Sequence, residues 1–252
     1  LNPIDRSFSV QFHIKPASRV NKKQIIVQKK LSLSKHFSIY LEDAASSTQN
    51  VNLGFVISSG SLVNRVVFEN LKKGSFSHVT AYYDKFTDQK LKIVVYDEHP
   101  TTMLERKRTA ISSNQVLFGN LNYENSPLTI GSGADFRTPP GTYSGGLFVP
   151  ITTFSGSIDE FRFFHTTFFE DSIQRMKDKN VAGEKNLVLY YKFNEPFGLH
   201  NGNDIILDSS GNSLNEKIIN FTTDARNTGS FNDNPVKSED ASRSPILFPG
   251  FP

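Results

Sequence analysis

The chain has 252 residues, a net charge of +3, 37% hydrophobic residues and 21% charged residues, values that exclude a disordered chain and a membrane chain. The small charge gives no reason to expect nucleic-acid binding, and no run approaches the roughly 18 apolar residues of a membrane-spanning helix. The absence of cysteine excludes disulfides, thiolate metal sites and a cysteine nucleophile. Because the sequence opens at Leu1 without methionine, we expect a processed product or a fragment.

The first predicted element is a strand over residues 8–14, where Phe8, Val10, Phe12 and Ile14 alternate with polar residues. Similar short runs follow, separated by Gly, Asn and Ser. We expect further strands at 24–28, 37–41, 51–57, 64–68, 78–84, 91–96, 127–131, 156–165, 187–193, 204–208 and 216–221. Many short strands predict an all-β fold, a two-sheet antiparallel jelly-roll sandwich.

One helix interrupts this pattern. Thr167 and Glu170 have the spacing of a capping box, and Phe169, Ile173 and Met176 form an apolar stripe at helical spacing. Residues 178–180 are expected to end it.

An extended C-terminal arm is predicted over residues 222–252. Its first part is polar and without apolar period, and three prolines near its end forbid a helix. The apolar residues Ile246, Leu247, Phe248 and Phe251 need a surface to cover them. Two alternatives stay open, docking on the same domain and contact with a neighbouring subunit.

Four blocks resemble the laminin-G-like branch of the concanavalin A-like jelly rolls. Residues 8–16 resemble the opening strand of that family, and 74–84 resemble its G-x-W-H-H-V-A-x-x-Y-D block with Phe76 in place of the tryptophan. Residues 156–164 match G-x-I-D-E-V-R-I-Y. Residues 189–195, together with 207–213, resemble the fourth block, L-x-x-Y-W-x-F-D-E followed by D-S-S-G-N-G.

The order of these blocks departs from the family pattern, because the D-S-S-G-N block usually comes first and here comes last. A second departure is 96–98, which lacks the usual D-G turn. We divide the chain into a jelly roll over 1–185, a strand pair over 186–221 and the arm over 222–252. The strand pair closes the same sandwich or leads into a further module.

The resemblance also raises the question of catalysis, because related glucanases carry E-x-D-x-x-E on a strand, with paired carboxylates as nucleophile and acid. Here Ser157 replaces the first glutamate, and Arg162 or Phe163 occupies the last position. Asp159 and Glu160 are adjacent, so they are expected to point to opposite faces of the strand. The sequence therefore predicts a protein that is not an enzyme.

Calcium is the one cofactor worth considering. Asp159, Asp208 and Asn212 lie where the resemblance allows a structural ion, and hard cations prefer such oxygen ligands. The alternative is an Asx-type turn at 208–212, whose aspartate accepts backbone hydrogen bonds. The six histidines have no spacing typical of a zinc site.

Tyr143, in a loop rich in Gly and Pro, is the preferred exposed aromatic for stacking on a sugar, whereas Tyr40, Tyr82 and Tyr83 sit in strands and are expected to pack. The Lys pairs, including 29–30, and the basic run 106–108 are interpreted as solvated turns.

The favoured function is a non-catalytic structural or adhesive module of a larger assembly, a virion protein such as a phage capsid, neck or tail component, with other subunits as partners. The alternative is a carbohydrate-binding lectin module of a secreted or cell-surface bacterial protein, assisted by calcium. Both place the chain on a virion or outside the cell.

Overall fold

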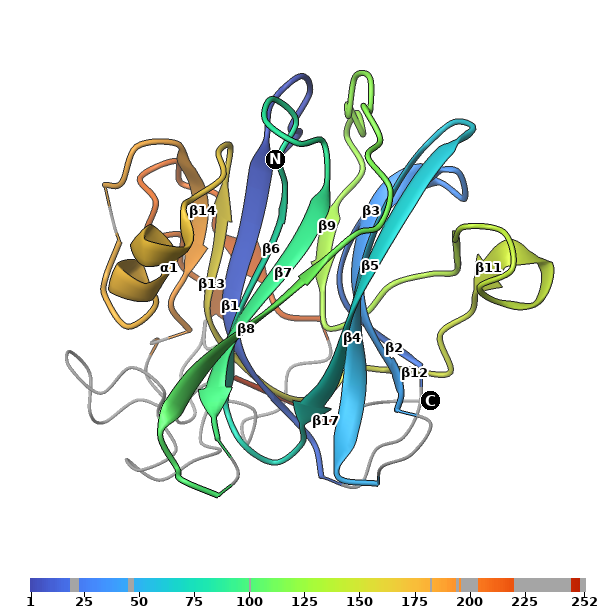
Figure 1. The fold of residues 1–252 in the computed structure, drawn as a ribbon. Helices are drawn as coiled ribbons and strands as arrows, with labels where there is room; N and C mark the ends of the chain where they lie inside the picture. The colour runs from blue at the N-terminus through green and yellow to red at the C-terminus, as the bar shows by residue number, and fades with distance from the viewer. Residues whose placement is uncertain are drawn as a thin grey trace.

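The computed structural model describes residues 1–18, 23–44, 48–99, 101–181, 183–193, 195, 204–219 and, for the backbone, 246–249. These residues form two β-sheets that pack face to face, with one short α-helix outside the sandwich (Figure 1). The predicted all-β sandwich with one short helix is therefore confirmed. Within these ranges, no helix has the length and apolar character needed to cross a membrane.

The first sheet has seven strands in the order β14-β13-β1-β6-β7-β8, and β17 also pairs with β13. Its strands are β1 (Phe8–Pro16), β6 (Ser77–Tyr83), β7 (Leu91–Glu98), β8 (Glu105–Ile111), β13 (Ser155–Phe164), β14 (Leu187–Tyr191) and β17 (Ile246–Pro249). All pairings in this sheet are antiparallel.

The second sheet has six strands in the order β12-β2-β3-β4-β5, and β9 also pairs with β2. Its strands are β2 (Gln24–Ser32), β3 (Lys35–Asp43), β4 (Asn50–Ser59), β5 (Leu62–Lys72), β9 (Leu128–Ile130) and β12 (Thr152–Thr153). Two small ribbons lie outside the sheets, β10 (Phe136–Arg137) with β11 (Leu147–Phe148), and β15 (Ile205–Ile206) with β16 (Glu216–Lys217).

The core lies between the sheets and is rich in phenylalanine. The predicted alternation of β1 buries Phe8, whose ring lies 5.2 Å from that of Phe37 on the opposite sheet and 5.7 Å from that of Phe163 on β13. Phe12 and Ile14 are also fully buried. Tyr40, Tyr82 and Tyr83 are buried as expected, although Tyr40 and Tyr82 belong to clusters on the outer faces.

Two local predictions were wrong. Helix α1 (Glu170–Met176) begins after Phe169, with no side-chain cap, so the capping box expected at Thr167 does not form. The basic run at 106–108 lies on β8, an edge strand that alternates exposed and half-buried residues rather than apolar and polar ones. Arg106 and Arg108 both pair with the buried Asp97, which explains why such a charged segment adds to the sheet.

The two C-terminal strands β14 and β17 pair with the edge of β13 that faces away from β1. β14 pairs with β13 over Phe161–Phe164, so this part of 186–221 lies in the seven-stranded sheet. β17 pairs with β13 over Ser155–Ile158, so the backbone of Ile246, Leu247 and Phe248 lies against its own domain, one of the two alternatives for the arm. Phe251 lies outside the described residues.

Each sheet has a cover on its outer face (Figure 1). Residues 165–181, which include α1, lie over the seven-stranded sheet and are called the α1 cover. Residues 131–149, which include β10, the 3-10 turn at Ser144–Gly146 and β11, pack against the six-stranded sheet and are called the loop cover. Both outer faces are therefore largely buried.

Candidate functional site

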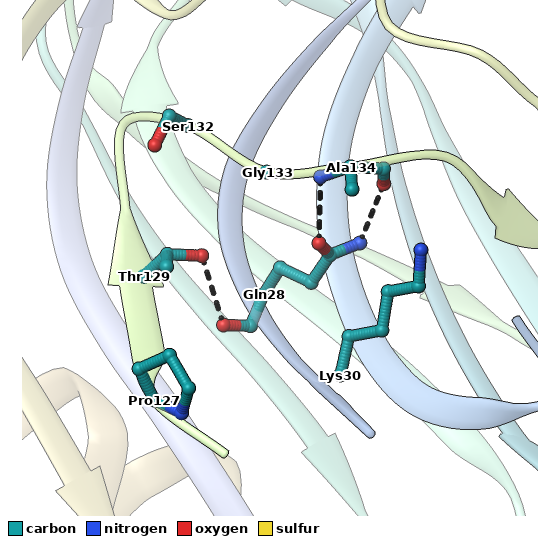
Figure 2. Close-up of a pocket in the computed structure, with 7 residues that line it drawn as sticks. All are labelled: Gln28, Lys30, Pro127, Thr129, Ser132, Gly133 and Ala134. Atoms are coloured by element: carbon teal, nitrogen blue, oxygen red, sulfur yellow. Dashed lines mark hydrogen bonds between the residues drawn. The ribbon is translucent and has the colours of Figure 1, made fainter. Parts of the chain in front are cut away.

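A pocket of about 330 Å³ opens where the loop cover leaves the six-stranded sheet. It is lined by Gln28, Lys30, Pro127, Thr129, Ser132, Gly133 and Ala134 (Figure 2). β2 supplies the first two residues, β9 supplies Thr129, and the turn that follows β9 supplies the last three.

Gln28 fixes the shape of this pocket. Its Oε1 accepts a hydrogen bond from the Ala134 N–H at 2.8 Å, and its Nε2 donates to the Ala134 carbonyl at 2.9 Å and to Ser38 Oγ at 3.0 Å. Thr129 Oγ1 donates to the Gln28 carbonyl at 3.1 Å (Figure 2). The side chain of Gln28 is buried and its amide is fully used, so it holds the loop in place rather than binding a ligand.

Gly133 allows the loop to approach this closely. A Cβ atom at this position would lie 2.8 Å from both Gln28 Oε1 and a methyl carbon of Ile25, closer than carbon atoms normally come. Glycine is therefore required by the close approach itself.

The exposed lining of the pocket is mostly apolar, with a few polar groups left for a ligand. Lys30 Nζ donates to the carbonyl of Asp135 at 2.6 Å and to its carboxylate at 3.2 Å, which leaves one N–H of the ammonium. The hydroxyl of Ser132 has no hydrogen-bond partner within the described ranges. The pocket thus offers donors and acceptors on a fixed backbone, with the ring of Pro127 as an apolar wall.

Tyr143, the predicted sugar-stacking residue, lies in the loop cover but is only half exposed. Its hydroxyl donates to the carboxylate of Glu42 and accepts from Arg65 Nη2 at 3.1 Å. Lys23 Nζ lies 4.7 Å from the centre of its ring, and the Phe148 ring meets it edge-on at 5.4 Å. The expectation of an exposed aromatic was wrong, because this side chain closes a buried cluster.

The cluster around Tyr143 holds the loop cover on the sheet through apolar ring contacts and one ion pair. The rings of Phe136 and Phe148 stack at 4.8 Å, and both contact Tyr40, which lies across Gly54 of β4. Arg65 pairs with Glu42 at 2.7 Å, while burial raises the pKa of the Glu42 carboxyl.

Two of the three predicted calcium ligands, Asp208 and Asn212, instead make hydrogen bonds to the protein backbone. Asp208 Oδ1 accepts from the N–H groups of Tyr190 and Ser210, and Oδ2 accepts from the N–H of Leu214. Burial acts to raise the pKa of this carboxyl, but these backbone bonds outweigh burial and lower it overall. Asn212 Nδ2 donates to the Val188 carbonyl at 2.9 Å. This is the geometry of the Asx-type turn.

Asp159 lies on β13, and the structure brings no three His, Asp or Glu side chains together as a possible metal site in the ranges it describes. Burial, followed by the neighbouring charge of Glu160, raises the pKa of Asp159 well above its usual value.

The two adjacent carboxylates do not point to opposite faces as predicted. The pairing of β13 with β1 shifts by one residue here, so Asp159 lies opposite His13 while Arg162 lies opposite Gln11. This is a β-bulge, with Glu160 at a φ of 52°. Glu160 accepts hydrogen bonds from Arg162 Nη2 at 2.7 Å and from the Tyr190 hydroxyl, on the face that the α1 cover protects.

Lys30 is a pocket residue that the sequence does not reveal, because the Lys29–Lys30 pair predicts a solvated turn. Both residues instead lie on β2, where Lys29 Nζ donates to the Ser126 carbonyl. A strand extended by two residues past Gln28 would have placed Lys30 on the same face as Gln28.

No protein-family profile matches the chain, and no curated protein matches it. Among solved structures, a candidate carbohydrate-binding protein from Bacteroides ovatus matches with a TM-score of 0.53 and 17% identity, over 85% of this chain and 52% of that one. The chain therefore spans about half the length of that structure.

Two other matches are weaker. Tailspike protein 2 of a bacteriophage of Escherichia coli O157:H7 has a TM-score of 0.47 and 12% identity, over 75% of this chain and 24% of its own. Domains LG4-5 of the mouse laminin alpha1 chain have a TM-score of 0.37 and 9% identity, over 65% and 37%. The likeness to the Bacteroides structure concerns the fold, and the fold is the expected one.

Proposed function

We propose that this chain, a concanavalin A-like jelly roll, is a non-catalytic carbohydrate-binding module that serves adhesion in a larger assembly on a virion or outside the cell. The observation that carries this proposal is the pocket beside Lys30, whose exposed lining is mostly apolar with a few polar groups. The carbohydrate-binding description of the Bacteroides protein with the same fold supports it.

The pocket has the properties that sugar binding needs. Its volume lies within the range of about 300–1,000 Å³ usual for small-molecule sites. Sugar hydroxyls both donate and accept, and the lining provides the Ser132 hydroxyl and one Lys30 N–H, whereas the Ala134 backbone is already bonded to Gln28 (Figure 2). The ring of Pro127 can contact the C–H groups of a pyranose.

The same lining supports binding rather than catalysis. Lys30 is the one titratable residue among those that line the pocket, and its ammonium is held by Asp135. Acid–base catalysis on a glycosidic bond requires two carboxyl groups on either side of it, and the pocket lining contains none.

A glycan array followed by calorimetry on the best glycan tests this proposal. We expect Lys30→Ala to weaken binding about tenfold, equivalent to about 1.4 kcal/mol, and Ser132→Ala to weaken it less. Lys185→Ala is the matched control, because Lys185 is exposed elsewhere and loses the same charge. Absence of binding to every glycan, or equal affinity for the Lys30 variant, would refute the site.

The partner role of the arm can be tested separately. Ser157 and Leu247 are register partners in the β13–β17 pair, and the chain has no other cysteine to interfere. The variant Ser157→Cys/Leu247→Cys should oxidise to a monomer with an internal disulfide, because directly opposed strand residues meet the required Cα separation. Disulfide-linked dimers that increase with concentration would show instead that the arm docks on neighbouring copies.

A further inference from the structure

The α1 cover lies over two histidines of the seven-stranded sheet. His13 of β1 and His78 of β6 are register partners, their ring centres lie 4.9 Å apart, and both residues are at most 4% exposed. Neither ring nitrogen of His78 has a hydrogen-bond partner among the described residues, and His13 Nδ1 has none there either. His13 Nε2 lies 3.7 Å from Asp178 Oδ1 of the cover. The cover therefore closes over a packed pair of histidines that water does not reach.

The charged groups around this pair already neutralise one another. On β13, Glu160 pairs with Arg162 at 2.7 Å. On the cover, Lys177 pairs with Asp178 and, at 2.6 Å, with Glu105 of β8. The titratable groups packed around the two histidines are Tyr96, Glu105, Asp159, Glu160, Arg162, Lys177 and Asp178. A proton on His78 therefore gains no carboxylate of its own.

This environment makes the closed cover unfavourable for protonated histidine. Burial lowers the pKa of His13, and it lowers that of His78 well below 6.5. The positive charges of Arg162 and Lys177 act on His78 in the same direction. Once the cover opens, both rings reach water and bind protons at about pH 6.5. Because the open state then binds more protons than the closed state, lowering the pH below about 6.5 favours opening.

The carboxyl groups near the cover do not produce this effect. The hydrogen bond from Lys107 lowers the pKa of Glu170. The hydrogen bonds of Asp178 outweigh burial and lower its pKa as well, so both carboxylates keep their charge at about pH 5. Burial raises the pKa of Asp159 well above 3.8, and a carboxyl of this kind favours the closed state in acid. Acid therefore acts against the cover through the histidines.

The cover rests on the sheet through two apolar clusters. Its residue Ile173 belongs to one cluster, and Met176 and Val181 belong to the other. The members on the sheet are Tyr82, Val94, Tyr96, Phe164, Leu187 and Tyr190. The cover itself contains one helix of seven residues and no strand of either sheet, so its release leaves both sheets intact. Release would expose a largely aromatic face of the seven-stranded sheet.

We propose that the α1 cover is a lid that acid releases. When His13 and His78 take up protons, residues 165–181 leave the sheet and uncover the outer face that carries Tyr82, Tyr96 and Tyr190. The chain thus presents an apolar surface in acidic surroundings and hides it at neutral pH. This device does not depend on the Lys30 pocket or on the proposed sugar binding.

Single introduced thiols can report the opening, because the chain has no cysteine of its own. Val94→Cys places a thiol on β7 beneath Ile173, whereas Val95→Cys, the next residue of the same strand, places it in the core between the sheets. Labelling by dithiodipyridine, which reacts with thiols in acid as well, is followed on both sides of about pH 6.5. Each rate is divided by that of the urea-unfolded chain at the same pH.

We expect labelling of the Val94→Cys chain to accelerate below about pH 6.5, by up to about tenfold per pH unit for each histidine. The Val95→Cys chain should stay protected over the same range. Adding His13→Gln/His78→Gln to Val94→Cys should remove the acceleration, and His78→Asn alone should halve its logarithmic slope.

His99→Gln is the matched control for the histidine variants, because His99 lies in the turn after β7 and away from the cover, and it should leave the acceleration unchanged. His165, at the start of the cover, is kept in every variant. The urea midpoint of each variant at neutral pH shows that it is folded, and His78→Asn carries the test if the double variant does not fold.

Acceleration that is confined to Val94→Cys and falls in the variants of His13 and His78 supports the proposal. Equal acceleration of Val94→Cys and Val95→Cys overturns it, because acid then unfolds the sandwich as a whole. Absence of acceleration, or acceleration that the variants of His13 and His78 leave unchanged, also overturns it. None of these outcomes bears on glycan binding at the Lys30 pocket.

Discussion

The two covers of this sandwich bury similar polar side chains in opposite ways. Under the loop cover, His36 donates from Nε2 to the Arg137 carbonyl at 3.0 Å and contacts Ser38 Oγ through Nδ1 at 3.2 Å. Ser38 Oγ also accepts a hydrogen bond from Gln28 Nε2. Under the α1 cover, His78 has neither nitrogen bonded and Gln11 has neither amide atom bonded within the described ranges.

This difference shows that burial of a sheet face does not by itself mean that its polar side chains have hydrogen-bond partners. The loop cover supplies backbone partners to His36 and Gln28, although Thr138 Oγ1 of that cover is unpaired among the described residues. The α1 cover provides partners for Arg162, Tyr96 and, through Asp178, His13, and leaves the side chains of Gln11 and His78 without a hydrogen-bond partner among the described residues. Four changes should break or sharpen the contrast.

Arg162→Met should have the largest effect, because it leaves the Glu160 carboxylate buried without its cation. Removing one partner of a buried ion pair costs about 3–5 kcal/mol. We expect a loss of this size in the free energy of unfolding, measured by urea titration. The double variant Glu160→Gln/Arg162→Met should lose less, and a single-variant loss below about 1 kcal/mol would show that the pair is not buried.

Acid should weaken the α1 cover next. Burial lowers the pKa of His13, outweighing the bond to Asp178 that raises it, and the pKa of His78 also lies well below 6.5. Arg162, Glu160, Lys177 and Asp178 are the charged groups around them. Because the unfolded histidine has the higher pKa, stability is complete above about pH 6.5. It falls as pH drops below that value, by up to about 1.4 kcal/mol per unit for each histidine.

Hydrogen exchange at about pH 7.5 and about pH 5, corrected for intrinsic rates, checks this point. Amides of 170–177 should lose protection in acid, because opening of the α1 cover lets His13 and His78 take up protons. Burial lowers the pKa of His36 to about 3, so the loop cover has an acid sensitivity of the same sign. The variant His13→Gln/His78→Gln should remove the loss at 170–177 and leave the loss at the loop cover. Unchanged acid loss at 170–177 in this variant would contradict the role of the two histidines.

Gly133→Ala tests the loop cover at the pocket. The added methyl group would meet Gln28 and Ile25 at 2.8 Å, so we expect a loss of about 1–3 kcal/mol, typical of overpacking. Gly119→Ala is the control, since no atom lies within 4 Å of its added Cβ. Equal stability of the Gly133 and Gly119 variants would mean that the loop held by Gln28 can shift to accommodate the added methyl group.

Glu170→Gln should have the smallest effect. The Glu170 carboxylate accepts from Lys107 and from the Thr109 hydroxyl at 3.2 Å, but the ion pair is more than one third exposed. Such pairs contribute about 0.2–1 kcal/mol. Asp171→Asn, one residue later in the same first turn, is the control, and thermal unfolding in low and high salt distinguishes them.

The sequence was most informative where one face of a strand meets the core. Alternation of Phe8, Val10 and Phe12 predicted β1, and the same pattern located most central strands. It failed at β8, where charged side chains pair with Asp97 and leave no apolar period. It also failed at Glu160, because a bulge changes which face a residue occupies and leaves no mark in a single sequence.

The candidate sites were less predictable than the fold. The residue type of Tyr143 and its Gly- and Pro-rich loop predict an exposed sugar contact, but tertiary contacts with Arg65 and Phe148 show that it supports the loop cover. Lys30 becomes a pocket residue through a turn about a hundred positions later, at Asp135. Pairings of this range are set by the fold and not by neighbouring residues.

The position of β1 in the middle of its sheet has a consequence for synthesis. One of its two partners, β6, follows within about 70 residues, but the other, β13, begins at Ser155. At roughly 5–20 residues per second, the open side of this phenylalanine-rich strand waits roughly 7–30 s for its partner to be made. During that interval the nascent chain carries an unpaired strand edge, which is the kind of edge that other chains can pair with.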